Sequence, residues 1–276
     1  MTPDAPLLLQ AQDLTRHYPV RRGLFRPAAV VRALDGVSLS LQPGRTLAVV
    51  GESGCGKSTL ARLLTLIEPP SGGTLRLRGE DATEPAVRTR MRREVQMVFQ
   101  NPYASLNPRF TIAQALTEPM EIHQIGADHA ERIARASALL KKVGLDESAL
   151  HKYPHEFSGG QRQRIAIARC LTLNPEVLVL DESVSALDVS VQAQVLNLLK
   201  DLQDEFGLSY IFISHDLAVV KFIADEVLVM QHGDVVEQAD AQELLRAPQQ
   251  DYTRRLLGAV PRGYQGPADT ASPAAA

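Results

Sequence analysis

A glycine-rich stretch near residue 50 ends in a lysine and a hydroxyl group. Residues 51–59 are GESGCGKST and fit the pattern G-x-x-x-x-G-K-[ST] at every fixed position. Glycines let the backbone wrap closely around an anion, with its N–H groups pointing inward. We therefore expect Lys57 to reach the β- and γ-phosphates of a nucleotide and the Ser58 hydroxyl to ligate Mg²⁺. The other expected members of this phosphate loop are Gly51, Ser53, Gly54, Cys55, Gly56 and Thr59.

The residues on either side predict the strand and the helix that such a loop requires. Residues 45–50 form a short apolar run typical of a buried strand, and residues 59–66 favour a helix. The loop would then lie at the N-terminus of a helix, where the positive end of the helix dipole favours an anion. The competing interpretation, a glycine-rich turn without a ligand, would not explain why the glycines lie between a strand and a helix.

Two adjacent carboxylates follow a second apolar run. Residues 177–180 are typical of a central parallel strand, and Asp181 and Glu182 come directly after it. Ligands in α/β folds bind at the carboxyl ends of such strands. We expect Asp181 to bind Mg²⁺, directly or through water, and Glu182 to orient or deprotonate a water molecule. His215 follows the similar strand 209–214; a histidine there is often structural, but the matching strand end favours the same site.

A second anion site is predicted at Ser158-Gly159-Gly160-Gln161. Ser158 as N-cap and Gln161 three residues on form a capping box, which starts a helix. The two glycines leave backbone N–H groups exposed at the helix N-terminus, where a phosphate can bind. Local chemistry alone favours the competing interpretation, an ordinary helix start without a ligand.

Three further features have competing interpretations. Tyr18, at the end of an alternating strand, can stack on a nucleotide base or simply pack. Cys55 lies near a helix N-terminus, which can lower the pKa of a thiol, so we expect alkylation to inhibit the protein and a bound nucleotide to protect it. His151 and His155 have the i, i+4 spacing of a metal-binding pair, but Pro154 argues against a continuous helix there.

The composition is that of an ordinary globular protein of 276 residues. Apolar residues make up 45% and charged residues 22%, and the net charge of −3 argues against a broad nucleic-acid surface. Only two cysteines, Cys55 and Cys170, indicate a reducing compartment and no disulfide framework, and Cys170 fits plain packing. We find no apolar run of membrane-spanning length and no signal peptide pattern. Any role at a membrane is therefore expected to act through partners.

Strand and helix patterns alternate along most of the chain, which predicts an α/β fold. Near the N-terminus, two alternating strands flank the basic stretch 19–31, which we expect to be a solvated hairpin loop. Strand signals vanish from about Thr111 to Cys170, so we expect a helical lobe, over about residues 104–172, inserted into the α/β core. Further helices are expected within about 239–260, and residues 261–276, rich in Pro, Gly and Ala, are expected to be a disordered tail.

Taken in chain order, these motifs resemble those of the ATP-binding subunits of ABC transporters. The residues that carry the resemblance are the phosphate loop 51–58, Gln100 after a strand, Phe157-Ser158-Gly159-Gly160-Gln161, Leu180-Asp181-Glu182, Ser185-Ala186-Leu187-Asp188 and His215. The resemblance covers roughly residues 7–260. It implies a P-loop NTPase (RecA-like) core with an antiparallel β subdomain and an inserted helical subdomain, and one cassette over residues 1–260.

Finer features resemble the dipeptide and oligopeptide importer subfamily. They are the segments 22–25, 100–108, 153–157 and 252–257. The resemblance implies an ATPase that energises solute import, most specifically of di- or oligopeptides. Importers of nickel and other small solutes share parts of these segments, so those solutes stay open. A soluble ABC ATPase without a transport role and a regulatory cassette are competing functions, and intact Glu182 and His215 argue against the regulatory cassette.

The resemblance also assigns roles to single residues. Tyr18 would stack on adenine, and Gln100 would contact Mg²⁺ and sense the membrane subunit. Glu182 would be the catalytic base or would position the water, and His215 would hold the γ-phosphate. The expected catalytic residues are therefore Lys57, Gln100, Glu182 and His215.

In the family, two subunits pair head to tail. Ser158, Gly159, Gly160 and Gln161 of one subunit would then bind the γ-phosphate of ATP held by the other, and Asp188 would communicate across the dimer. The expected cofactors are ATP and Mg²⁺. The expected partners are a second ATP-binding subunit, identical or not, two transmembrane permease subunits and, indirectly, an extracytoplasmic solute-binding protein, with no nucleic acid. The chain would lie at the cytoplasmic face of the cell membrane.

The chain departs from the family pattern at Ser183, where proline is usual after the Asp-Glu pair. Proline there sets the backbone shape and does no chemistry. We therefore expect hydrolysis to be retained, with a change confined to the local turn.

Overall fold

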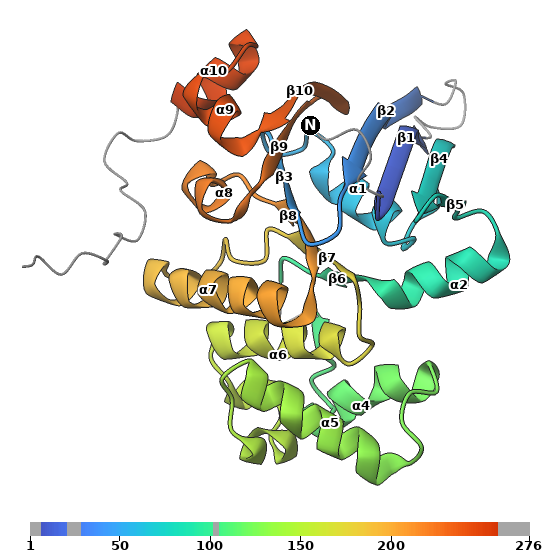
Figure 1. Ribbon diagram of the computed structural model, residues 1–276, viewed down its shortest axis with the longest axis vertical. Coiled ribbons are helices and arrows are strands. Elements are labelled where there is room, and N and C mark those ends of the chain that lie inside the picture. The colour runs from blue at the N-terminus through green and yellow to red at the C-terminus, as the bar shows by residue number, and fades with distance from the viewer. Residues whose placement is uncertain (1–6, 21–28, 102–104, 259–276) are drawn as a thin grey trace, which may run out of the picture.

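The computed structural model describes residues 7–20, 29–101 and 105–258, which form two sheets and the helices around them (Figure 1). The tail expected over 261–276 and the segment 22–25 lie outside these ranges. None of the helices in the described ranges combines the length and apolar character needed to cross a bilayer. The elements are, in chain order, β1 (Leu9–Val20), β2 (Ala29–Leu41), β3 (Thr46–Val50), α1 (Lys57–Leu64), β4 (Gly72–Leu77), β5 (Glu80–Asp81), α2 (Pro85–Glu94), β6 (Val95–Val98), α4 (Ile112–Ile122), α5 (His129–Lys142), the 3₁₀ turns η1 (Glu147–His151) and η2 (Pro154–Glu156), α6 (Gly159–Leu171), β7 (Val177–Asp181), α7 (Val189–Phe206), β8 (Ser209–Ile213), α8 (Leu217–Ile223), β9 (Glu226–Gln231), β10 (Asp234–Asp240), α9 (Ala241–Arg246) and α10 (Asp251–Gly258).

The smaller sheet is antiparallel, in the order β2-β1-β4-β5. β1 and β2 pair along their whole lengths, so the hairpin loop expected over 19–31 is shorter than predicted. β1 continues to Val20 and β2 starts at Ala29. Pro19 fits into β1 because β4 pairs with β1 only as far as Thr15, which leaves Pro19 beside a single neighbouring strand.

The larger sheet has the order β10-β9-β3-β8-β7-β6, and all of its strands except β10 run parallel. β3, β7 and β8 are buried along their whole lengths. Since parallel strands end at one edge of a sheet, the phosphate loop after β3, Asp181 at the end of β7 and His215 just after β8 come to the same edge. Gln100, which closely follows β6, reaches it as well. The α/β architecture predicted from the sequence is confirmed.

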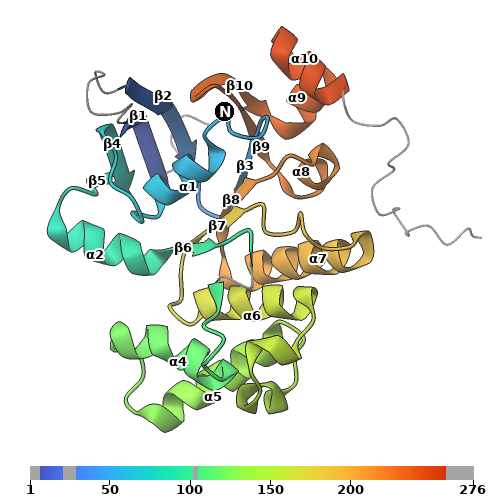
Figure 2. The same cartoon turned by 180° about the vertical axis from the view of Figure 1, so that it is seen from behind.

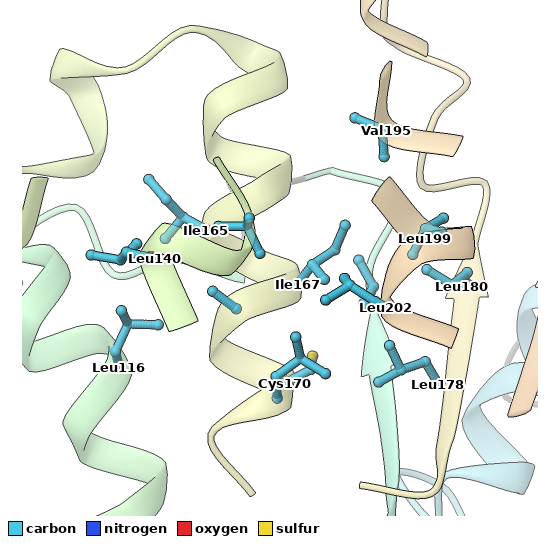
Figure 3. Close-up of a cluster of buried hydrophobic side chains, with 14 of the residues drawn as sticks. Leu116, Leu140, Ile165, Ile167, Cys170, Leu178, Leu180, Val195, Leu199 and Leu202 are labelled. Atoms are coloured by element: carbon cyan, nitrogen blue, oxygen red, sulfur yellow. The ribbon is translucent and has the colours of Figure 1, made fainter. Parts of the chain in front are cut away.

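The helical lobe consists of α4, α5, α6 and the two 3₁₀ turns, and it lies at the opposite end of the molecule from α9 and α10 (Figure 2). Figure 3 shows Ile165, Ile167 and Cys170 of α6 between Leu140 of α5 on one side and Leu178 of β7 on the other. One buried apolar cluster therefore runs from the lobe to β7. The lobe is packed directly onto the strand that ends in the two carboxylates.

Side chains cap the starts of α5 and α6, and the cap at Ser158 was predicted from the sequence. Asp128 accepts a hydrogen bond from the Glu131 N–H at 2.8 Å at the start of α5. At α6, Ser158 Oγ accepts from the Gln161 N–H at 3.3 Å, and Gln161 Oε1 accepts from the Ser158 N–H at 3.0 Å. Each bond pairs a backbone donor that a helix N-terminus would otherwise leave without a partner. Gly144 follows α5 with φ at 73°, as a residue that ends a helix.

Candidate active site

The backbone of the phosphate loop approaches its neighbours so closely that two positions must be glycine. A Cβ at Gly51 would lie 2.3 Å from the carbonyl oxygen of Met230, and one at Gly56 would lie 2.6 Å from that of Ala33. Both residues also have positive φ, 154° and 112°. Glycine at these two positions therefore lets the loop pack closely between β9 and β2.

The ammonium of Lys57 lies inside the loop. Its Nζ donates to the carbonyl oxygens of Gly51 at 2.7 Å and Glu52 at 2.9 Å, and the side chain is buried. Beside it is a hollow of about 250 Å³, which we name the phosphate hollow. It is lined by Ala33, Ser53, Gly54, Gly56, Lys57, Ser58, Thr59, Gln100 and Glu182.

Two oxygen ligands suited to a hard cation lie next to each other at the edge of this hollow. Ser58 Oγ donates to Asp181 Oδ1 at 3.1 Å. Burial, helped by the neighbouring Glu182 charge, raises the pKa of Asp181 although the Ser58 hydroxyl acts the other way. Hydroxyl and carboxylate oxygens are ligands that Mg²⁺ prefers, and a cation there would compensate the buried charge of Asp181. The residues present fit the ion.

Glu182 is contacted by two other predicted site residues. Its Oε2 accepts a hydrogen bond from Gln100 Nε2 at 2.9 Å and lies 3.4 Å from His215 Nδ1. Glu182 has φ at 44°, an uncommon conformation for a residue with a side chain, and its N–H donates to Ile213 O of the adjacent strand at 3.0 Å. The backbone thus directs this carboxylate toward the phosphate hollow. Uncommon backbone conformations of this kind are concentrated at functional sites.

Tyr18 stands apart from the phosphate hollow and has partners of its own. Its hydroxyl donates to Glu68 Oε2 at 2.5 Å, and the Arg16 guanidinium lies 4.7 Å from the ring centroid. The hydroxyl bond from Tyr18 is the main reason that the pKa of Glu68 is lowered. Stacking of Tyr18 on adenine stays a prediction.

The second predicted anion site is intact but separate from the first. A Cβ at Gly160 would lie 2.3 Å from Val191 Cγ1, so a glycine is needed for α6 to pass close to α7. Asp188 caps α7, accepting from the Val191 N–H at 3.0 Å and the Ser190 hydroxyl at 2.8 Å. In the described part of the chain, neither Asp188 nor residues 158–161 line the phosphate hollow. The two helix starts that were predicted to bind anions therefore lie apart in this chain.

The expectation of an activated thiol at Cys55 is wrong. Cys55 is buried, and this burial raises the pKa of the thiol in spite of the nearby Lys57 ammonium. The helix N-terminus is outweighed by the loss of hydration. Cys170 donates to Met97 O at 3.5 Å, and burial raises its pKa to about 12, in keeping with the predicted packing role. His151 lies in η1, not on a continuous helix with the histidine of η2.

Sequence reasoning missed two contacts that hold the phosphate loop from outside. The Gly233 N–H, in the turn between β9 and β10, donates to Cys55 O at 2.9 Å. The Glu52 N–H donates to the hydroxyl of Tyr252 in α10 at 3.2 Å. Tyr252 is in the segment 252–257 noted above, but no local pattern links it to a loop 200 positions earlier.

Comparison with known proteins identifies the family. A family profile described as "ABC transporter" matches residues 34–185. The dipeptide transport ATP-binding protein DppF of Escherichia coli (strain K12) is 56% identical over 257 residues, covering 92% of this chain and 77% of that protein. The oligopeptide transport ATP-binding protein AppF of Bacillus subtilis (strain 168) is 50% identical over 92% of this chain and 78% of that protein. The chain belongs to the ABC transporter family.

A solved structure agrees with this assignment. The fold of this chain matches that of the ATP-binding cassette MJ0796, whose structure is described as a dimer in a post-hydrolysis state bound to ADP and Pi. The TM-score is 0.74 at 28% identity, over 85% of this chain and 99% of that one. As a member of this family with such neighbours, the ABC transporter chain is an ATPase of a transport system.

Proposed function

We propose that this chain is the ATP-hydrolysing subunit of an importer of di- or oligopeptides. Relatives named for dipeptide and oligopeptide transport share 56% and 50% of its residues over 92% of the chain, which supports the solute class. The observation that carries the catalytic part is the meeting of Gln100 and His215 on one carboxylate oxygen of Glu182, at 2.9 Å and 3.4 Å, beside the phosphate hollow.

The residues around the hollow have different roles in phosphoryl transfer to water. The loop N–H groups and Lys57 bind the β- and γ-phosphates, whose charge they stabilise as the transferred group moves. Glu182 orients the attacking water and takes its proton, and His215 contacts the γ-phosphate. Mg²⁺, held by Ser58 and Asp181 with Gln100 nearby, neutralises phosphate charge when bound. Little covalent chemistry is required of the protein, so positioning dominates.

The two predicted anion sites of one chain lie apart, so a single nucleotide can contact both kinds of site only if they come from two subunits. We infer a head-to-tail dimer in which Ser158, Gly159, Gly160 and Gln161 of one subunit contact the γ-phosphate at the other subunit's phosphate loop. The triphosphate then favours the closed dimer because it has more contacts there than in the open one. Loss of the γ-phosphate releases the clamp. Tyr18 would stack on the adenine in this arrangement.

The proposed partners follow from this role. They are a second ATP-binding subunit, two transmembrane permease subunits and, through these, an extracytoplasmic solute-binding protein. The chain would then be peripheral, at the cytoplasmic face of the membrane. We also propose that the cassette spans residues 1–260, with a helical subdomain over about 104–172 and a helical extension over about 239–260.

The test is ATP hydrolysis by the wild type and by Glu182→Gln, measured by phosphate release. Removing the base is expected to reduce turnover by about 10²–10⁴-fold, while ATP affinity is retained. Light scattering of the variant with ATP is expected to show twice the monomer mass of 30.1 kDa. Turnover near the wild-type rate in Glu182→Gln would contradict the assignment of the base.

The solute class needs a separate measurement. The chain would be reconstituted with its permease and binding-protein subunits in vesicles, and ATP-dependent uptake of a labelled dipeptide would be compared with uptake of nickel. Dipeptide uptake that Glu182→Gln abolishes is expected. Uptake of nickel alone would replace the peptide assignment and leave the ATPase assignment in place.

A further inference from the structure

The hydroxyl of Tyr252 ties the C-terminal helix α10 to the phosphate loop. It accepts a hydrogen bond at 3.2 Å from the N–H of Glu52, the second residue of the loop. The Tyr252 side chain is buried and belongs to an apolar cluster that includes Ala48 and Val50 of β3. The ring is therefore anchored on the strand that leads into the loop, and its hydroxyl meets the first peptide group beyond Gly51.

Glu52 also contacts the lysine of the loop. Its carbonyl oxygen accepts from Lys57 Nζ at 2.9 Å, while its N–H is held by Tyr252. One residue of the loop thus connects α10 with the ammonium that meets the phosphates. The partner of this N–H comes from a helix that begins 199 positions later in the chain.

The position of Tyr252 is fixed by contacts that do not involve the loop. The carboxylate of Glu237 in β10 accepts from the N–H groups of Gln249 at 2.8 Å and Gln250 at 3.1 Å, the two residues before α10. Arg254 in α10 donates to Pro248 O at 3.1 Å and to Gln249 O at 2.7 Å. Burial raises the pKa of Tyr252, so the phenol is uncharged at neutral pH. The hydroxyl is therefore presented to Glu52 by a segment with its own anchoring.

We propose that Tyr252 is a positioning residue for the phosphate loop, and that docking of α10 is thereby coupled to ATP affinity. The inference rests on the proposed function, in which the loop binds the ATP phosphates. A loop whose second residue is held in place has less conformational freedom to lose when it closes around an anion. Linkage then requires the converse, that bound ATP stabilises the docking of α10 by the same free energy.

The test uses Tyr252→Phe, which removes the hydroxyl and keeps the ring in its apolar cluster. The matched control is Tyr210→Phe. Tyr210 is also buried, and its hydroxyl donates to Leu199 O at 2.6 Å, between β8 and α7 and away from the loop. Both variants lose one buried tyrosine hydroxyl bond, so a general loss of stability affects both.

Nucleotide binding, turnover and hydrogen exchange together separate positioning from stability. The Kd for a fluorescent ATP analogue and the KM for ATP are expected to rise roughly threefold to tenfold in Tyr252→Phe, with kcat changed by less than about twofold. Tyr210→Phe is expected to keep the wild-type Kd. In hydrogen exchange without nucleotide, the peptide that contains the phosphate loop is expected to exchange faster in Tyr252→Phe alone, and ATP is expected to slow exchange in α10 of the wild type.

The opposing outcomes are distinct. Wild-type affinity in Tyr252→Phe, or an equal loss of affinity in both variants, would overturn the positioning role and leave the proposed function intact. A wild-type chain that fails to bind the ATP analogue would overturn the proposed function and this inference together.

Discussion

Ser183, the residue after Glu182, has a buried hydroxyl that has no hydrogen-bond partner in the described structure. A buried hydroxyl without a partner costs about 1–3 kcal/mol of stability. Ser183→Ala removes that hydroxyl, and we expect it to raise the free energy of unfolding by about 1 kcal/mol, or the Tm by about 2–4 °C. Thermal unfolding followed by circular dichroism measures the change.

A second serine provides the control for this prediction. Ser209 is equally buried, but its Oγ accepts from the Gly44 N–H at 2.8 Å. Ser209→Ala leaves that donor without its partner and is expected to lower the free energy of unfolding by about 1 kcal/mol or more. A loss of stability in Ser183→Ala as large as that in Ser209→Ala would show that the Ser183 hydroxyl does have a partner.

Sequence reasoning found the site residues whose chemistry is visible in their immediate neighbours. Lys57, Ser58 and Asp181 follow from a glycine pattern and from a strand that ends in carboxylates, and the structure brings them together. It failed for Cys55, because burial of its thiol depends on the whole surrounding fold. It also missed Tyr252, whose partner is 200 positions away.

At the scale of elements, the start of α6 depends on how closely it passes α7. Gly160→Ala would place a methyl group 2.3 Å from Val191 Cγ1, and a β-branched side chain packed against a helix can move little. We expect this variant to lose about 1–3 kcal/mol of stability, measured by denaturant unfolding. The adjacent Gly159 is the matched control, since a Cβ there meets nothing closer than 3.8 Å. Equal stability of the two variants would contradict the close approach of α6 to α7.

Helices and strands were predictable where the residues that determine their ends are close in sequence. They were less predictable where the ends depend on pairing between two strands. The capping residue Ser158 indicated the start of α6 because a cap acts within one helical turn. The length of the β1–β2 hairpin was underestimated because two prolines and three arginines within residues 19–31 suggest a loop. Strand pairing up to Val20 and Ala29 overrides that composition, and pairing is a property of two segments together.

At the scale of the whole molecule, the proposal that the two predicted anion sites act across a dimer can be tested by complementation. Lys57→Met disables the phosphate loop of a subunit, and Ser158→Ala disables its second anion site. In a head-to-tail dimer that contains one of each, one composite site keeps both intact halves. Mixing the two inactive variants in equal amounts is therefore expected to restore about a quarter of the wild-type phosphate release, since half of the random dimers have one working site of two.

The same mixing experiment can also contradict the head-to-tail dimer. If both anion sites served one nucleotide within a single chain, every subunit in the mixture would remain defective and no activity would return. Each variant alone, at the same total concentration, provides the baseline.

The sheet order is the part of the fold that chain order does not reveal. β3 was predicted from its apolar run, and the α/β class from the alternation of strands and helices. The neighbours of β3 are nevertheless β8 and β9, and the segments between them along the chain form other parts of the molecule. No local pattern in residues 46–50 specifies these partners, because every strand of the parallel sheet has a similar apolar sequence.

That sheet order has a consequence for synthesis on the ribosome. The Gly44–Ser209 bond beside β3 spans 165 positions, so at usual elongation rates roughly 10–30 s pass between synthesis of β3 and that of β8. β1, β2 and β4 pair with one another and can do so early, whereas β3 has to wait for β8 and β9, the two strands with which it pairs. A nascent chain halted before β8 is therefore expected to hold the phosphate loop without a sheet to support it, and to need a chaperone until the last strands emerge.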